Sequence, residues 1–220
     1  MRDGQVAIAA INGPRHTVLS GTAAALAALE PQCTARQWRC RALETTHAFH
    51  SPLVEPALDA FRQVAEQVAY QRPQWPYVSS LTGTWAPDEV ASADYWCRHL
   101  RHTVRFHDAL QCAVAAAPAA YLEVGAGNTL CALVRSALRG TAPCVLPGLR
   151  GDDQEWTAHL TALGQLSVRG ARLRWPVVWG APRRKVTLPS YPFQRQRYWF
   201  TATAPAPVTS LPGTTSLPGT

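Results

Sequence analysis

The 220-residue sequence contains one lysine among its 21 basic residues, one methionine, and no apolar run long enough to span a membrane. Its first residues do not lead into an apolar segment with a small-residue cleavage site, so a signal peptide is not predicted. These absences favour a soluble, cytoplasmic protein without a membrane partner. A hydrophobic content of 47% is sufficient for a packed core.

Closely spaced cysteines are also missing. The six cysteines form no CxxC pair, so we expect free thiols rather than a zinc site or a disulfide framework. Two HxxH pairs occur, His47 with His50 and His99 with His102, but neither has a cysteine or carboxylate partner at metal-ligand spacing. The sequence therefore predicts no metal site.

Acidic residues are fewer than basic ones, and the formal net charge is +7. Such a charge can indicate nucleic-acid binding. The arginines are spread through periodic segments, however, and no nucleic-acid-binding motif accompanies them. We therefore predict no nucleic-acid partner. A basic surface would equally suit an acidic carrier protein or the phosphates of a coenzyme.

The first part of the chain alternates strand and helix patterns. Residues 6–20 predict a β-hairpin, because the turn residues Asn12-Gly13-Pro14-Arg15 separate two apolar runs. An alanine-rich helix with Thr22 as its N-cap should follow and end near Glu30. Three further elements are predicted: an arginine-laced strand at 38–43, a helix from 52 to about 69, and a strand at 76–81.

A histidine stands between the first of these strands and the helix that follows it. Ser51 suits the N-cap of that helix, and Pro52 suits its first position. His50 would thus lie just outside a helix N-terminus, whose positive dipole end disfavours an imidazolium. A neutral histidine is a candidate general base, although a histidine in such a position is more often structural.

The later part of the chain predicts a second group of elements. A helix from Ala93 carries aromatic and apolar residues that periodicity alone would assign to a core. Further elements are predicted as a strand at 120–124, a helix at 129–138, a strand at 144–147 and a helix at 152–168. The GxG turn at 125–127 invites a nucleotide-binding interpretation, but the third glycine of that motif is missing, because residue 130 is leucine.

The end of the chain changes in composition. Residues 186–199 combine prolines, aromatics and arginines without a period, which indicates an extended segment that contacts another protein surface. Aromatics between arginines could also stack on nucleic-acid bases. Residues 201–220, which include a repeated Thr-Ser-Leu-Pro-Gly-Thr, have the composition of a disordered linker.

Four sequence motifs, which follow one another in the family order, resemble those of the acyltransferase domains of type I polyketide synthases. These domains are relatives of malonyl-CoA:acyl carrier protein transacylase. The motifs are HAFHSPL at 47–53, YWCRHLRHTVRF at 95–106, EVGAGNTL at 123–130 and LPSYPFQRQRYW at 188–199. The resemblance covers nearly all of residues 4–200. It implies an α/β fold with a partial α/β-hydrolase-like large subdomain and an incomplete ferredoxin-like small subdomain, followed by an extended linker.

The resemblance also divides the chain. It implies a partial ferredoxin-like subdomain with the histidine motif at 1–81 and the C-terminal part of the large subdomain at 82–150. Residues 151–200 would be the linker that follows the acyltransferase domain, and 201–220 a disordered tail. The first strand and first helix of the small subdomain have no counterpart in the sequence, so we expect uncovered apolar surface and marginal stability.

The family chemistry requires a serine in a GxSxG elbow and a histidine that takes its proton. The residue that matches this histidine is His50. His47 and Phe49 match positions associated with the choice of extender unit, and HAFH resembles malonyl-selecting domains. Phe49 would fill the space that an α-methyl group needs. Arg105 matches a residue that braces the loop of the histidine.

No GxSxG occurs in the sequence. The resemblance therefore implies part of an enzyme that loads malonyl from malonyl-CoA onto the phosphopantetheine of an acyl carrier protein, and that is inactive as this chain alone. The alternative is a non-catalytic fragment that docks on a ketosynthase through residues 186–200. The expected partners are thus the acyl carrier protein and the ketosynthase, and no cofactor is expected to bind directly.

Overall fold

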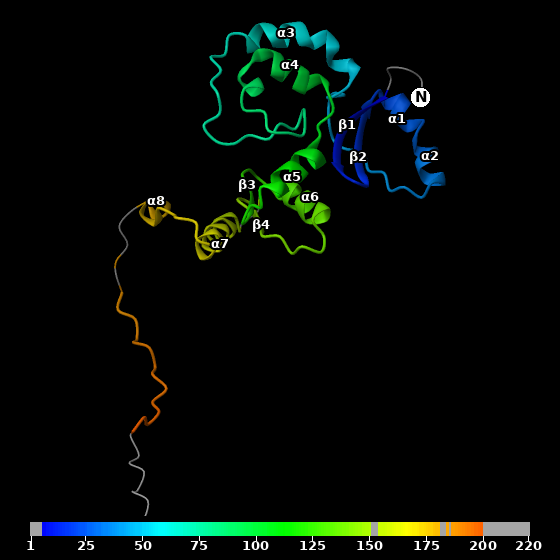
Figure 1. Cartoon of the computed structure of the whole chain (residues 1–220). Helices are drawn as coiled ribbons and strands as arrows, with labels where there is room; N and C mark the ends of the chain where they lie inside the picture. The colour runs from blue at the N-terminus through cyan, green and yellow to red at the C-terminus, as the bar shows by residue number, and fades with distance from the viewer. Residues whose placement is uncertain (1–5, 151–153, 181–183, 185, 200–220) are drawn as a thin grey trace, which may run out of the picture. The chain divides into compact units, whose positions relative to one another are not determined.

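The computed structural model describes residues 6–150, 154–180, 184 and 186–199. The chain forms two units, residues 1–173 and 174–220 (Figure 1). None of the helices in the described part of the chain combines the length and the apolarity needed to cross a bilayer.

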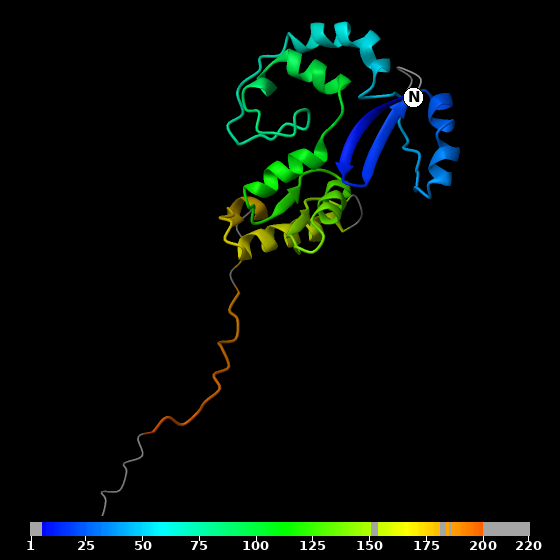
Figure 2. The same ribbon diagram turned by 45° about the vertical axis from the view of Figure 1, so that its right-hand side comes forward.

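The first unit begins with the predicted hairpin. Strands β1 (Val6–Gly13) and β2 (His16–Gly21) pair antiparallel, as Figure 2 shows. β1 also pairs with Val104, which donates its N–H to the Ala9 carbonyl and accepts the N–H of Ile11, both at 2.8 Å. The hairpin is thereby tied to the connection between helices α4 (Ala93–Arg101) and α5 (Phe106–Ala115).

Two short helices follow where one was predicted. Helix α1 (Ala23–Ala27) begins at the predicted N-cap Thr22, whose hydroxyl accepts the N–H of Ala25 at 3.2 Å. Helix α2 (Glu30–Ala35) then starts where the predicted helix was to end, with a proline in its first turn. Proline suits that position, because the first N–H groups of a helix have no intrahelical partner.

The segment at 38–43 is not a strand, so this prediction was wrong. Trp38 and Leu43 are 63% and 57% exposed. Alternating side chains suit a half-buried strand, but a strand also needs a neighbour for its backbone, and none of the described residues pairs with this segment. Residues 76–81 are likewise no strand, and Val78 forms only a single bridge with Trp85. Among the described residues, the expected ferredoxin-like sheet is reduced to the β1–β2 hairpin.

Two helices next to the histidine motif pack side by side (Figure 1). They are α3 (Glu55–Ala65), which ends four residues before the predicted Ala69, and α4 (Ala93–Arg101). A 3₁₀ turn, η2 (Glu89–Ala91), precedes α4. Two ion pairs join the helices: Arg101–Glu55 at 2.7 Å and Arg62–Asp94 at 3.1 Å.

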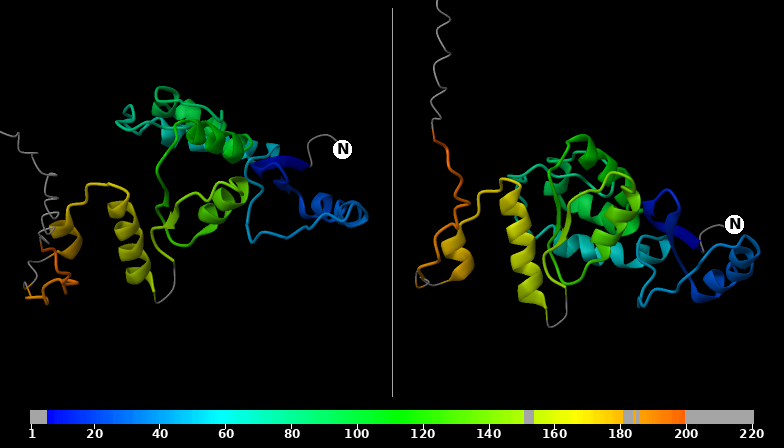
Figure 3. Two further views of the ribbon diagram at one scale, coloured as in Figure 1. Left: turned by 60° about the horizontal axis from the view of Figure 1, so that its bottom comes forward. Right: turned by 90° about the horizontal axis from the view of Figure 1, so that it is seen from below.

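The remaining elements of the first unit form a small α/β core close to the predicted one. Strands β3 (Tyr121–Glu123) and β4 (Val145–Pro147) pair in parallel. The helices are α5 (Phe106–Ala115), α6 (Thr129–Ala137) and α7 (Glu155–Val168). Buried Leu110, Cys131, Val134 and Val145 form its centre. Helix α7, the long yellow helix in Figure 3, packs against β4.

The second unit contains helix α8 (Trp175–Trp179), whose terminal tryptophan rings stack with centroids 6.0 Å apart. Residues 186–199 lie in no helix or strand. The predicted tail at 201–220 lies outside the described residues. The domain boundaries at 81, 150 and 200 stay predictions.

Candidate functional site

His50 lies in the turn that leads into α3. The hydroxyl of Ser51, which is buried, accepts the N–H of Leu53 at 3.2 Å and donates to the Ala48 carbonyl at 2.6 Å. Ser51 thus caps the 3₁₀ turn η1 (Pro52–Val54), as predicted. The backbone of His50 has a φ of +58°. A left-handed conformation costs a non-glycine residue about 1 kcal/mol, and such residues cluster at functional sites.

The imidazole of His50 binds the C-terminal end of α4. Its Nδ1 lies 3.0 Å from the His99 carbonyl oxygen and 2.9 Å from that of His102. The His50 backbone N–H donates to the Leu100 carbonyl at 3.2 Å. The last carbonyls of a helix have no intrahelical partner, so His50 satisfies groups that α4 leaves open.

This contact determines which ring nitrogen is basic. A carbonyl oxygen can only accept, so Nδ1 must carry the hydrogen, and Nε2 keeps its lone pair. Nε2 is therefore the ring nitrogen that is able to accept a proton, as a general base must. The sequence prediction considered only the helix after His50, whereas the ring contacts the opposite pole of another helix.

His99 supports His50 from within α4. The Nε2 of His99 lies 2.9 Å from Ser80 Oγ, and the two imidazoles meet edge to face with centroids 5.9 Å apart. Burial, and then the charge of His50, lower the pKa of His99. The neutral form of the His99 ring is therefore favoured where it contacts Ser80 and His50.

His47 and Phe49 lie together in the same loop. Their ring centroids are 5.8 Å apart, and the Thr46 hydroxyl lies 2.8 Å from His47 Nδ1. The Phe49 side chain is 45% exposed. The structure thus places both residues beside His50 in the chain, and their part in extender choice stays a prediction.

Arg105 lies at the start of α5, where its Nε donates to Asp108 at 2.7 Å. Its backbone N–H donates to the Ser80 carbonyl at 2.6 Å. The contacts that hold the His50 ring come instead from backbone carbonyls of α4, which leave no residue-type signal in a sequence. The bracing role of Arg105 stays a prediction.

No serine hydroxyl within the described residues contacts His50. The nearest in sequence, that of Ser51, is used as a helix cap, and that of Ser80 contacts His99. In the same part of the chain, no group of three or more His, Cys, Asp or Glu side chains could hold a metal ion. The arrangement therefore presents a proton acceptor without its nucleophile.

Comparison with known proteins identifies the family to which this site belongs. The family model of the acyl transferase domain matches residues 2–173. The chain belongs to the acyl transferase domain family. The acyltransferase sequence is 40% identical over 201 residues to polyketide synthase GfsA of Streptomyces halstedii. The match covers 90% of this chain and 3% of GfsA.

Solved acyltransferase domains share the fold. The domain from the second module of the salinomycin polyketide synthase has a TM-score of 0.75 and 39% identity, and the match covers 81% of this chain and 42% of that one. The acyltransferase domain of SpnD, in complex with 2-(pent-4-yn-1-yl)malonyl, has a TM-score of 0.72 and 29% identity, over 77% and 42% of the chains. The chain thus spans less than half of each solved domain.

Glu123, the first residue of the EVGAGNTL motif, caps helix α6. Its two carboxylate oxygens accept the N–H groups of Leu130 at 3.1 Å and Cys131 at 2.8 Å. A nucleotide phosphate bound after a GxG turn would use the same helix N-terminus. The capping carboxylate occupies that position, so the structure does not support the nucleotide-binding alternative.

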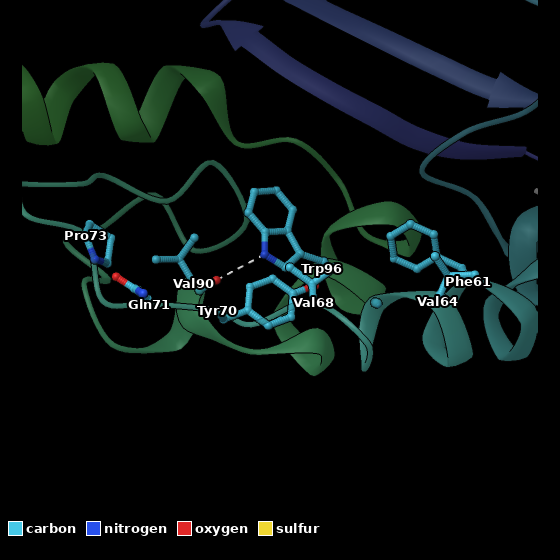
Figure 4. A pocket seen from close by; sticks show the side chains of 9 residues that line it. Phe61, Val64, Val68, Tyr70, Gln71, Pro73, Val90 and Trp96 are labelled. Carbon is cyan, nitrogen blue, oxygen red and sulfur yellow. Dashed lines mark hydrogen bonds between the residues drawn. The ribbon is translucent and has the colours of Figure 1, made fainter.

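An apolar groove of about 400 Å³ lies along α3 and the segment that follows it (Figure 4). The Trp96 indole forms part of its wall and donates to the Val90 carbonyl at 3.0 Å. The full lining is Phe61, Val64, Ala65, Val68, Tyr70, Gln71, Pro73, Val90 and Trp96. None of the predicted site residues, His47, Phe49, His50 and Arg105, lines the groove.

Proposed function

We propose that this chain supplies the histidine of an acyltransferase that moves malonyl from malonyl-CoA to the phosphopantetheine of an acyl carrier protein in polyketide biosynthesis. The observation that supports the proposal is the His50 ring, whose Nδ1 is held by two carbonyls while Nε2 keeps its lone pair. Membership of the acyl transferase domain family supports acyl transfer as the reaction class. The proposal needs no bound cofactor.

In this mechanism, the nucleophile is a serine in a GxSxG elbow, which the 220 residues do not contain. Nε2 of His50 would take the serine proton as the hydroxyl attacks the thioester, and would then return it to the CoA sulfur as that group leaves. In the second half, Nε2 takes the proton of the carrier-protein thiol as its sulfur attacks the acyl-serine ester, and returns that proton to the serine oxygen as the ester bond breaks. Each step needs a basic Nε2 on an anchored ring, which the carbonyls of His99 and His102 supply.

The main test of the proposal is complementation. The chain is mixed with a separately expressed GxSxG-bearing segment of a related acyltransferase domain, labelled malonyl-CoA and a phosphopantetheinylated carrier protein. We expect transfer of label only from the mixture, and a loss of about a hundredfold or more in rate for His50→Ala. His16→Ala, on an exposed strand of the hairpin, is the matched control and should retain the rate. Serine-bound malonyl on this chain alone, or full activity of His50→Ala, would contradict the proposal.

We attribute the preference for malonyl to Phe49, whose ring stands against His47 and takes up space that an α-methyl group would need. One methyl group is worth about 1–3 kcal/mol of discrimination, so Phe49→Ser should shift the malonyl to methylmalonyl ratio about tenfold toward methylmalonyl. The assay is competition between the two CoA esters in the complemented system. Phe193→Ser, in the exposed segment at 186–199, is the control. An unchanged ratio for Phe49→Ser would contradict this assignment.

A second candidate function is non-catalytic docking on a ketosynthase, which would be a second protein partner. It is supported by residues 186–199, whose large apolar side chains are 70–87% exposed. Aromatic residues exposed in this way are typical interface anchors. Titration calorimetry with a ketosynthase domain should detect binding that Tyr198→Ala with Trp199→Ala abolishes, while His50→Ala leaves it intact. Equal binding by the aromatic variant would rule out this segment as the contact.

A further inference from the structure

Residues 102–104, in the connection between α4 and α5, contact both the candidate base and the hairpin. The His102 carbonyl oxygen lies 2.9 Å from Nδ1 of His50. The next residue, Thr103, donates its hydroxyl to the carbonyl of Ile8 in β1 at 2.6 Å. One short segment thus carries an acceptor of the His50 ring and a side-chain hydrogen bond to the hairpin.

Helix α4 fixes only one side of His102. The backbone N–H and Nδ1 of His102 both donate to the Arg98 carbonyl, at 2.9 and 2.8 Å. The helix has ended there, because the backbone of His102 is extended, with a φ of −100° and a ψ of 163°. An extended ψ turns the carbonyl of that residue out of the helical direction. The direction of the His102 carbonyl therefore depends on the residue that follows.

That residue is held by β1. The His102 carbonyl and the Thr103 nitrogen belong to one planar peptide unit, so a restraint on Thr103 also restrains the carbonyl. The backbone of Val104 pairs with β1 at the next position, and any residue type can form those bonds. The hydroxyl of Thr103, by contrast, makes a side-chain bond that a substitution can remove.

We propose that Thr103 is a positioning residue for His50. Its hydroxyl, bound to the Ile8 carbonyl, directs the His102 carbonyl at Nδ1 and so keeps the hydrogen of the ring on that nitrogen. A neutral imidazole can carry its hydrogen on either nitrogen, and the hydrogen bond made by one nitrogen sets the state of the other. The inference rests on the proposed role of Nε2 as the base, because only a bare Nε2 can take a proton.

The first test measures transfer in the complemented assay. Thr103→Val removes the hydroxyl and keeps a β-branched side chain. A neutral hydrogen bond is worth a factor of about two to ten in an equilibrium, and the His99 carbonyl, 3.0 Å from Nδ1, remains as a second acceptor. We therefore expect kcat to fall about fivefold at an unchanged KM for malonyl-CoA. Thr103→Ser keeps the hydroxyl and should restore kcat, and Thr17→Val, at an exposed threonine of β2, is the matched control.

The second test observes the ring directly and needs no transfer activity. The full chain, labelled with ¹⁵N, is studied by NMR at about pH 8, above the ordinary pKa of histidine. The His50 ring signals are identified by their loss in His50→Ala. We expect Nδ1 to give the signal of a protonated nitrogen and Nε2 that of a bare one. Thr103→Val should move both signals toward intermediate values, as a mixture of the two tautomers does, whereas Thr103→Ser should not.

The two readouts separate this inference from the acyl-transfer proposal. A complemented mixture that transfers no label with the unchanged chain contradicts acyl transfer, and the ring signals then decide whether Thr103 positions His50. A shift of the ring signals and a lower kcat in Thr103→Val, both reversed in Thr103→Ser, support the positioning role. Unchanged ring signals in Thr103→Val, equal effects of the valine and serine variants, or loss of the amide signals of the whole hairpin in Thr103→Val would overturn it.

Discussion

The capping carboxylate of Glu123 allows a prediction whose size follows from the structure. Its oxygens accept the N–H groups of Leu130 and Cys131, which are among the first four amides of α6 and have no carbonyl partner inside the helix. Desolvation alone would raise the pKa of Glu123, but the hydrogen bonds from these two amides offset it and hold the pKa below its ordinary value. The charged form is therefore the one that caps the helix.

Glu123→Gln keeps one acceptor oxygen but replaces the other with an NH₂ group that cannot accept. It also removes the charge from the positive end of α6. A hydrogen bond to a charged acceptor contributes about 1.5–3 kcal/mol, and a neutral one about 1 kcal/mol, so the expected loss is about 2 kcal/mol. Protection of the Leu130 and Cys131 amides against hydrogen exchange should then fall about thirtyfold.

The assay is amide hydrogen exchange followed by NMR from pH 7 to pH 3. Glu44→Gln, an exposed carboxylate in the segment before the histidine motif, makes the same change of charge without a capping bond. Because the pKa of Glu123 is lowered, its contribution is present above its ordinary pKa of 4.5 and is lost as the pH falls through the folded value. Equal protection in Glu123→Gln and Glu44→Gln, or a difference that persists unchanged at pH 3, would refute the reasoning.

Two further predictions concern stability, measured by urea unfolding. The pKa of His99 is lowered from 6.5 by burial and then by the charge of His50, so the unfolded chain binds a proton more readily than the native one. The contribution of His99 to the free energy of unfolding should be fully present above about pH 6.5 and should fall as the pH drops toward the folded pKa. His99→Gln should remove this part of the pH dependence of the unfolding free energy. An unchanged pH dependence in His99→Gln would contradict the assignment. Gly83 has a φ of +78°, and a Cβ there would lie 2.6 Å from Asp108 Cβ, so Gly83→Ala should cost about 2–3 kcal/mol. Gly127→Ala, at a φ of +98° with no atom within 4 Å of the added Cβ, should cost only about 1 kcal/mol; equal losses would exclude the clash with Asp108.

Local signals predicted several elements correctly. The turn at 12–15 separates β1 from β2, Thr22 caps α1, and Ser51 caps the turn into α3. Each depends on backbone preferences and hydrogen bonds between residues a few positions apart, which neighbours in the sequence settle by themselves. The family resemblance rests on four sequence motifs, so it does not depend on the tertiary structure, and the family match confirms it.

Signals that need a distant partner were less informative. The alternation at 38–43 predicted a strand, but the described residues hold no neighbour for its backbone, and the segment stays exposed. The predicted helix end near Glu30 was wrong for a different reason. Helix α1 ends earlier, at Ala27, and Pro31 lies in the first turn of α2, a position that proline suits.

The sequence by itself determined that His50 belongs to the histidine motif of the acyltransferase family and directly precedes a helix. Only the tertiary structure decided which nitrogen of the ring is basic. That choice depends on the carbonyls of His99 and His102, about fifty residues away in the chain, and every residue type carries the same carbonyl group. Packing of α3 against α4 brings these carbonyls to the ring.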